Sequence, residues 1–146
     1  MKVKCLYVNN AEVPELIEKY GYHAQEIIHL TRGREYTVYG MISFAIDGSL
    51  PSLSYIIRDD CDHGVLDNIS DYPAMLFEVT DSRLADVEWH FSFNKNGMDF
   101  ILGYDDFVNN REHYERAIER DEPDRSRLVE WCNMIDKIQA EEDKRK

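Results

Sequence analysis

The chain has 146 residues, of which 43% are hydrophobic and 12% aromatic, and its formal net charge is −12. This composition supports one domain with an ordinary core and excludes a wholly disordered chain. The acidity excludes binding to nucleic acid or to an anionic membrane through the protein's own field. It favours a basic partner, although solubility alone would explain it equally well.

The acidic residues are concentrated between residues 59 and 106, a segment that we call the acidic window. It contains twelve carboxylates and two bases, Arg83 and Lys95, which gives a net charge of −10. Three cysteines are too few and too widely spaced for a disulfide framework or a zinc signature. The first residues lack the apolar segment of a signal peptide, and no apolar run reaches the length of a membrane span. We therefore expect a soluble cytoplasmic protein.

The N-terminal part predicts a strand and then a short helix. Residues 2–8 predict the strand, which Asn9 and Asn10 end. Apolar side chains then recur at helical spacing at Val13, Leu16, Ile17 and Tyr20. Pro14 suits the first turn of this helix and Gly21 suits its end. Residues 22–31 are compatible with an extended or a helical segment.

The most regular stretch of the chain alternates between apolar and polar residues over positions 35–46. Its apolar face is formed by Tyr36, Val38, Gly40, Ile42, Phe44 and Ile46. A period of two predicts one long strand that covers a core on one side. Gly40 lies in the middle of that face, where it would permit the tight bend by which a small sheet curls towards a barrel.

Turn residues at 47–51 predict a hairpin to a return strand at 53–57. Further strands are predicted at 65–69, 75–80, 87–93 and 98–103, with a tight turn at 94–97. From Asp105 the period becomes helical, and Pro123 divides this part into two helices. Strands first and helices last predict an α+β fold in one domain, residues 1–146. It would consist of a small curled antiparallel sheet over about residues 1–104 and two C-terminal helices over about 105–140.

The predicted core combines the apolar faces of these strands: Tyr36, Val38, Ile42, Phe44, Tyr55, Ile57, Phe77, Trp89 and Phe91. The second C-terminal helix carries an apolar stripe: Leu128, Trp131, Cys132, Ile135 and Ile138. We expect this stripe to dock on the sheet or on the preceding helix, through Tyr114 and Ile118. An exposed stripe would instead indicate a structural subunit that binds a partner through its helices.

No stretch carries a specific catalytic or cofactor signature. Asp59 to Gly64 is rich in side chains that can bind metals, but Ser70 stands where a calcium loop needs a bidentate glutamate. Zinc would need further cysteine or histidine ligands nearby. Nucleophile elbows and phosphate loops are absent from the sequence, so we predict no cofactor and no metal. A small hydrolase or nucleotide-processing enzyme that uses carboxylates and a histidine is the alternative.

Three motifs carry a resemblance to a known group of proteins. They are Gly33-x-x-Tyr36-x-Val38-Tyr39-Gly40, Tyr72-Pro73-Ala74-x-Leu76-Phe77-Glu78-Val79-x-Asp81 and Trp89-x-Phe91. Over about residues 30–93 the chain resembles small bacterial immunity proteins of contact-dependent growth-inhibition and related polymorphic toxin systems. The resemblance implies a partly open SH3-like barrel with flanking helices that binds and neutralises one cognate toxin. It transfers no functional residues.

The expected function is therefore neutralisation of a basic toxin domain, such as a nuclease, by occlusion of its positively charged active site. No catalytic activity is expected. The contact residues are expected in the acidic window, first on its loop side at Asp59, Asp60, Asp62, Asp67, Asp71 and Tyr72. Second choices are Glu78, Asp81, Asp86 and Glu88. Asp59, Asp60 and Asp62 should be exposed on a loop, and tyrosines beside acids, such as Tyr39, Tyr72 and Tyr104, are candidate anchors.

Overall fold

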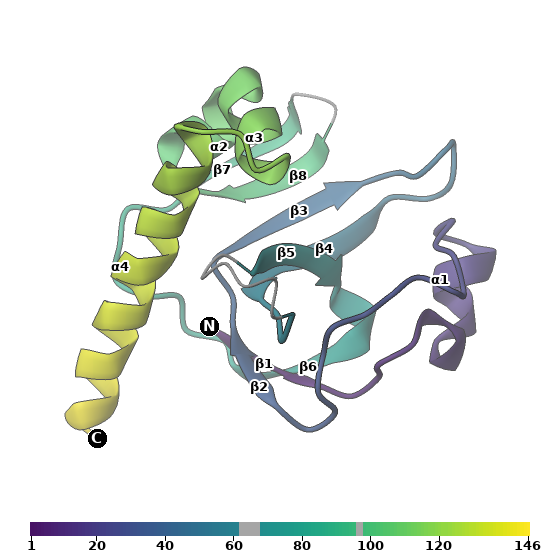
Figure 1. Cartoon of the computed structure of the whole chain (residues 1–146), viewed down its shortest axis with the longest axis horizontal. Coiled ribbons are helices and arrows are strands. Elements are labelled where there is room, and N and C mark those ends of the chain that lie inside the picture. The colour runs from purple at the N-terminus through teal and green to yellow at the C-terminus, as the bar shows by residue number, and fades with distance from the viewer. Residues whose placement is uncertain (62–67, 96–97) are drawn as a thin grey trace.

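The computed structural model describes residues 1–61, 68–95 and 98–146 (Figure 1). These residues form two antiparallel sheets and four α-helices, which confirms the predicted α+β class. The sheets do not close into a barrel. None of the described helices is long and apolar enough to cross a lipid bilayer.

The smaller sheet has the strand order β2-β1-β6. Its strands are β1 (Lys2–Cys5), β2 (Glu35–Thr37) and β6 (Phe77–Asp81). The predicted first strand is thus shorter than expected. The predicted strand at 75–80 begins only at Phe77, because a 3-10 turn, η2 (Ala74–Leu76), precedes it.

The larger sheet has the strand order β5-β4-β3-β8-β7. Its strands are β3 (Gly40–Phe44), β4 (Ser52–Arg58), β5 (Ile69–Pro73), β7 (His90–Lys95) and β8 (Met98–Gly103). The β3–β4 hairpin turns at Asp47 and Gly48, whose φ angles are 43° and 77°, as the turn residues predicted. Most of the predicted strand at 65–69 lies outside the described residues.

The long alternating stretch is one continuous run in sequence but two strands in space. It leaves the smaller sheet after Thr37 and enters the larger sheet at Gly40, so the expectation of a single strand was wrong. A Cβ atom on Gly40 would lie 2.9 Å from the carbonyl oxygen of Leu102 and 3.3 Å from Cδ1 of Ile56. Glycine is therefore required where the corner brings β3 against its neighbours.

Two hydrophobic cores lie on either side of this corner. One, which we call the tyrosine core, contains Tyr22, Tyr36, Tyr55 and Tyr72 with Leu16 and Phe77. The other, which we call the helix-side core, joins the larger sheet to the C-terminal helices. Six of the nine predicted core residues are buried: Tyr36, Val38, Ile42, Tyr55, Ile57 and Phe77. Phe44 and Trp89 are half-buried and pack against the helix-side core.

Phe91 is the one predicted core residue that the structure contradicts, because 65% of its surface is exposed. β7 is an edge strand that begins only at His90 and pairs with β8 alone. The side chain of Phe91 lies beside that of Phe93, with their ring centroids 5.9 Å apart, and Phe93 is exposed as well. The alternation was correctly identified, but no second layer formed by the described residues covers this face of the hairpin.

The N-terminal helix forms as predicted but is short. It consists of a 3-10 turn, η1 (Asn10–Glu12), and α1 (Pro14–Glu18), which buries Leu16 in the tyrosine core. The predicted first C-terminal helix is divided into α2 (Asp105–Asn109) and α3 (Arg111–Ile118). Asn110 separates them and caps α3, because its side chain accepts a hydrogen bond from the backbone N–H of His113.

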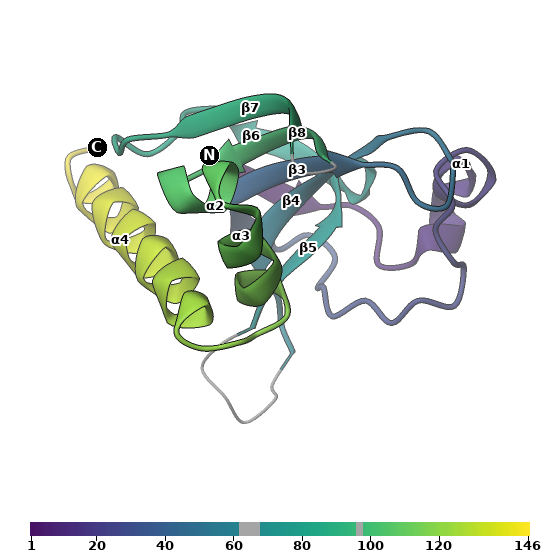
Figure 2. The same ribbon diagram turned by 90° about the horizontal axis from the view of Figure 1, so that it is seen from above.

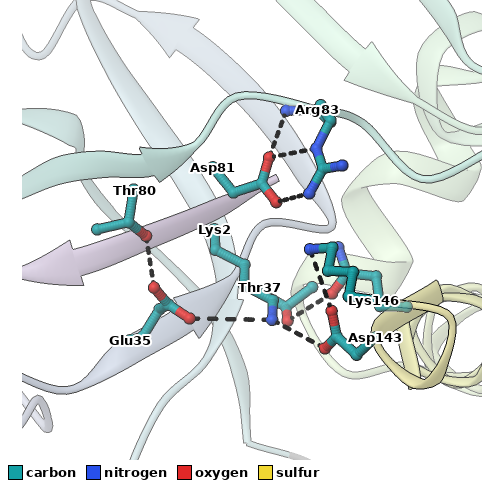
Figure 3. A network of polar contacts seen from close by, with 9 residues as sticks. Lys2, Glu35, Thr37, Thr80, Asp81, Arg83, Asp143 and Lys146 are labelled. Atoms are coloured by element: carbon teal, nitrogen blue, oxygen red, sulfur yellow. Dashed lines mark hydrogen bonds and ion pairs between the residues drawn. The ribbon is translucent and has the colours of Figure 1, made fainter. Parts of the chain in front are cut away.

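The last helix, α4 (Asp124–Lys144), docks through its apolar stripe as predicted. Leu128, Trp131 and Ile135 are buried in the helix-side core together with Tyr114. Figures 1 and 2 show α4 beside α2 and α3 on one side of the molecule, with α1 at the opposite end. At its far end, α4 reaches the smaller sheet, where Lys2 Nζ lies 3.2 Å from Asp143 Oδ2 (Figure 3).

Candidate functional site

Asp59 and Tyr72, two of the predicted contact residues, are buried partners of each other. Asp59 is only 5% exposed, and its carboxylate accepts hydrogen bonds from the Tyr72 hydroxyl at 2.6 Å and from the Cys61 N–H at 2.9 Å. Burial and the hydrogen bond to Asp59 raise the pKa of Tyr72 well above its ordinary value. The expectation that Asp59 is exposed on a loop was therefore wrong, because the hydroxyl group of Tyr72, on the neighbouring strand β5, binds the carboxylate.

Asp60 is also engaged within the protein. Its half-buried carboxylate accepts hydrogen bonds from Tyr36 Oη at 2.5 Å and from Thr31 Oγ1 at 2.6 Å, and it pairs with Arg34 at 2.6 Å. Burial and the bond to Asp60 raise the pKa of Tyr36 to about 12. Through Thr31 and Arg34, Asp60 thus links the segment before β2 to the residues that follow β4. Asp62 and Asp67 lie outside the described residues.

Three further predicted acids lie on strands. Asp71 is half-buried on β5, and burial raises the pKa of its carboxyl group. Glu78 is exposed on β6 and pairs with Lys4 at 2.8 Å. Asp81 binds Arg83 through both carboxylate oxygens, at 3.0 Å and 2.7 Å, and this contact holds the pKa of Asp81 well below its usual range (Figure 3). The structure does not bring these three acids together.

Asp86 and Glu88, the remaining predicted acids, line one concave site together with residues of α2 and α4. This site, which we call the acidic groove, has a volume of about 530 Å³. It lies between residues 86–90, the start of α2 and one face of α4. Its lining consists of Asp86, Val87, Glu88, His90, Tyr104, Asp105, Asp106, Arg127, Trp131, Met134 and Ile138.

The groove is acidic because four carboxylates line it and Arg127 is its one Arg or Lys among the described lining residues. Arg127 is already engaged, since it pairs with Asp106 and lies over the ring of Tyr104, 5.9 Å from its centroid. The carboxylates of Glu88 and Asp105 are largely exposed. The rim of the groove therefore carries a net negative charge. Arg127, the one arginine or lysine among the described lining residues, pairs with Asp106 and does not neutralise the other three carboxylates.

The floor of the groove is formed by aromatic side chains, and a hydrogen bond and ring contacts fix the position of Trp131. Trp131 donates a hydrogen bond from Nε1 to the backbone oxygen of Tyr39 at 2.8 Å. Its ring meets Trp89 edge-on, with centroids 5.0 Å apart, and lies 5.4 Å from the ring of Tyr104. Met134 adds a flexible thioether that is 42% exposed. Trp131 and Tyr104 are each only 8% exposed, so a cationic side chain entering the groove would meet the carboxylates of the rim and the exposed thioether of Met134 above these rings.

Two groups of titratable residues lie in or beneath the groove. His90 has Glu88 Oε1 at 3.3 Å from Nε2 and Asp105 Oδ1 at 4.0 Å from Nδ1. Beneath the floor, the Tyr104 hydroxyl lies 2.5 Å from Nε2 of His113, which is 2% exposed. The other ring nitrogen of His113 lies 2.6 Å from Asp124. Burial raises the pKa of Tyr104, so its phenol stays neutral near pH 7.

A metal centre would need a denser cluster than these groups form. Within residues 1–61, 68–95 and 98–146, no group of three or more His, Cys, Asp and Glu side chains is placed to hold a metal ion.

Most of the groove was missed by reasoning from the sequence. Asp86 and Glu88 were second choices, and His90, Asp105, Trp131 and Met134 were not proposed as contact residues. One signal was present, because Arg127, Trp131, Met134 and Ile138 recur at helical spacing along one face of α4. Trp131 and Ile138 were assigned to the docking stripe, and Met134 was assigned no role. Comparison of the chain with protein-family models, with curated proteins and with solved structures found no match.

Proposed function

We propose that the protein binds a basic protein segment in the acidic groove and thereby neutralises a cognate toxin domain, such as a nuclease, in the cytoplasm. The observation that supports this most is the placement of Asp86, Glu88 and Asp105 around the aromatic floor at Trp131. A toxin that cleaves nucleic acid must expose positive charge to attract phosphates. The groove offers the complementary charge.

The two parts of the groove would have separate effects on binding. The exposed carboxylates would increase the association rate by steering a basic partner, and salt would weaken that effect. The floor at Tyr104, Trp131 and Met134 would hold one inserted side chain and set the dissociation rate. Because Trp131 is fixed by its bond to Tyr39, little conformational entropy would be lost there on binding.

The proposed function is the one that the sequence resemblance to bacterial immunity proteins implies. The motif residues of this resemblance are mainly structural: Gly33 adopts a φ of 82° in a turn, Gly40 forms the corner and Trp89 packs against Trp131. A shared scaffold with a contact surface that differs between members would produce such a pattern. The acidic groove would then be the surface particular to this chain.

The proposal predicts that a neighbouring gene encodes a large secreted protein with a basic C-terminal domain, and the test is co-expression with that domain. The wild-type protein should restore growth and bind the domain in a kinetic assay. Asp86→Lys combined with Glu88→Lys should slow association by about tenfold or more at low salt, with the loss shrinking at high salt. The matched control is Glu15→Lys with Glu18→Lys on α1, which carries the same charge change at the opposite end of the molecule. Equal binding by both double variants would refute the groove as the contact surface.

A second candidate function is a small hydrolase, and the arrangement of His90 between Glu88 and Asp105 favours it. A histidine held beside a carboxylate can act as a general base. Turnover of a chromogenic ester or phosphodiester by the wild type, with loss of turnover in His90→Gln, would support this reading. Turnover that persists in the variant would exclude His90 as the base.

A further inference from the structure

A second, smaller cavity lies far from the acidic groove, between η1, the segment before β2 and the edge strand β5. Its volume is about 100 Å³, and its polar lining includes Asn10, Tyr22, Glu26 and Asp71. We call it the N-terminal cavity. Glu26 is exposed, and Ile27, which also lines the cavity, is 77% exposed. The cavity therefore lies directly beneath the surface.

Asn10 lines this cavity, and its side chain is 1% exposed and only partly satisfied in hydrogen bonding. Its Nδ2 group donates to the His23 carbonyl oxygen at 3.1 Å and to Glu26 Oε2 at 2.9 Å. Both partners are acceptors, which fixes the orientation of the amide. Oδ1 is buried and accepts no hydrogen bond from any described residue. A buried acceptor in this state is unfavourable and marks a position where a donor belongs.

The charge around the cavity selects the kind of donor. Glu26 and Asp71 are its charged lining residues, and the described lining contains no lysine, arginine or histidine. Burial raises the pKa of Asp71, and the charge of Glu26 raises it further. The charge of Glu26 thus disfavours ionisation of Asp71, and a cation placed between the two side chains would relieve this repulsion.

We propose that the N-terminal cavity binds a primary ammonium group, which donates a hydrogen bond to Asn10 Oδ1 and is attracted by Glu26. A volume of about 100 Å³ suits a head group of about three heavy atoms, since one water occupies about 30 Å³ in the liquid. The ammonium can come from a free alkylamine or from a lysine side chain of another protein. The proposal does not depend on the function assigned to the acidic groove.

The test follows the side-chain amide signals of Asn10 by NMR during titration with ethylammonium chloride. A ligand of three heavy atoms binds at best with a Kd of about 1 mM, so the expected result is a saturable shift in the millimolar range. Sodium chloride controls for ionic strength. Tetramethylammonium chloride controls for charge without a hydrogen-bond donor. Nα-acetyl-lysine amide distinguishes the two sources, because its saturable binding shows that a lysine side chain can enter.

Glu26→Gln should weaken ethylammonium binding about fivefold or more, because the amide keeps the acceptor for Asn10 but loses the charge. Glu26 is exposed, so the variant should keep the fold, and Glu18→Gln on α1 is the matched control that should not change ethylammonium binding. An equal shift with sodium or tetramethylammonium would overturn the proposal. Absence of saturable binding to the wild-type protein would also overturn it, and water would then be the donor to Asn10 Oδ1.

Discussion

Two parts of the acidic window contain the same residue type in opposite situations. Asp59 and Asp60, at the end of β4, accept hydrogen bonds from Tyr72 and Tyr36 and are enclosed. Asp86 and Glu88, ahead of β7, stand at the rim of the groove and are exposed. The comparison shows that a run of acids in a sequence does not by itself mark an acidic surface. What decides the outcome is whether the neighbouring strand supplies hydroxyl and N–H donors.

The strand pairing explains why the first pair is enclosed. Tyr72 on β5 pairs with Tyr55 on β4, so its hydroxyl comes from the strand directly beside the one that leads to Asp59. Residues 86–89 lie outside the strands of the described residues, and the side chains of Asp86 and Glu88 are exposed. Four substitutions test this difference.

The largest effect is expected from reversing the charge of the enclosed acid. Asp59→Lys should lower the free energy of unfolding by about 3–5 kcal/mol, because it buries an unpaired charge and leaves the Tyr72 hydroxyl without its acceptor. Asp86→Lys, the matched reversal at the groove, should change it by less than about 0.5 kcal/mol. Urea denaturation measures both. Similar values for the two variants would remove the distinction between the enclosed and the exposed acids.

The next largest effect is expected at Tyr36, whose hydroxyl group donates a hydrogen bond to Asp60. Tyr36→Phe removes the donor to Asp60 and the acceptor of the Thr31 N–H, which should cost about 1–2 kcal/mol. Tyr55→Phe is the control, since this ring is buried in the same core and packs on the same Phe77 ring, without a hydrogen bond to any described residue. A loss no greater in Tyr36→Phe than in Tyr55→Phe would show that Asp60 does not depend on the hydroxyl.

A third substitution uses the dependence of stability on pH. Burial raises the pKa of Asp71 in the folded state above its unfolded value, so folding favours the protonated form. Its contribution to stability is present at low pH and is lost as the pH rises through the folded pKa. Asp71→Asn should therefore raise the melting temperature at pH 7 and lose this advantage near about pH 3, where the unfolded carboxyl group is also protonated. A gain of the same size at both pH values would assign the effect to packing.

The smallest effect is expected on β6. Glu78→Gln removes an exposed ion pair with Lys4 and should change the free energy of unfolding by less than about 0.5 kcal/mol. The same denaturation assay compares it with Asp59→Lys. A loss of more than about 1 kcal/mol would place Glu78 with the enclosed acids instead of with the exposed ones.

Local patterns in the sequence predicted a good part of the fold. Turn residues located the β3–β4 hairpin, and helical spacing identified the stripe on α4 that docks through Leu128, Trp131 and Ile135. The corner between β2 and β3 was not predictable as a change of sheet, because alternation continues through it unbroken. Phe91 was misplaced for a related reason, since alternation identifies two faces of a strand but not which of them a second layer covers.

The candidate site was less accessible than the fold because it depends on contacts between distant segments. The groove forms only where residues 86–90 meet a face of α4 about forty positions later. The enclosure of Asp59 depends on a tyrosine thirteen residues away in sequence. Spacing along one element could suggest Arg127, Trp131 and Met134 as a face. It could not indicate that acids from another segment would stand opposite them.

Both tryptophans of the chain, Trp89 and Trp131, lie on the helix-side core, whereas Tyr22, Tyr36, Tyr55 and Tyr72 lie in the tyrosine core. Tyrosines lie in both cores, since Tyr39, Tyr104 and Tyr114 belong to the helix-side core. Tryptophan is therefore the intrinsic optical reporter that is confined to one half of the molecule. Emission excited at the red edge of the spectrum comes from tryptophan and follows the helices and the groove. The tryptophan rings, at an interplanar angle of 85°, also form a coupled pair of chromophores. A ligand in the groove should perturb that pair.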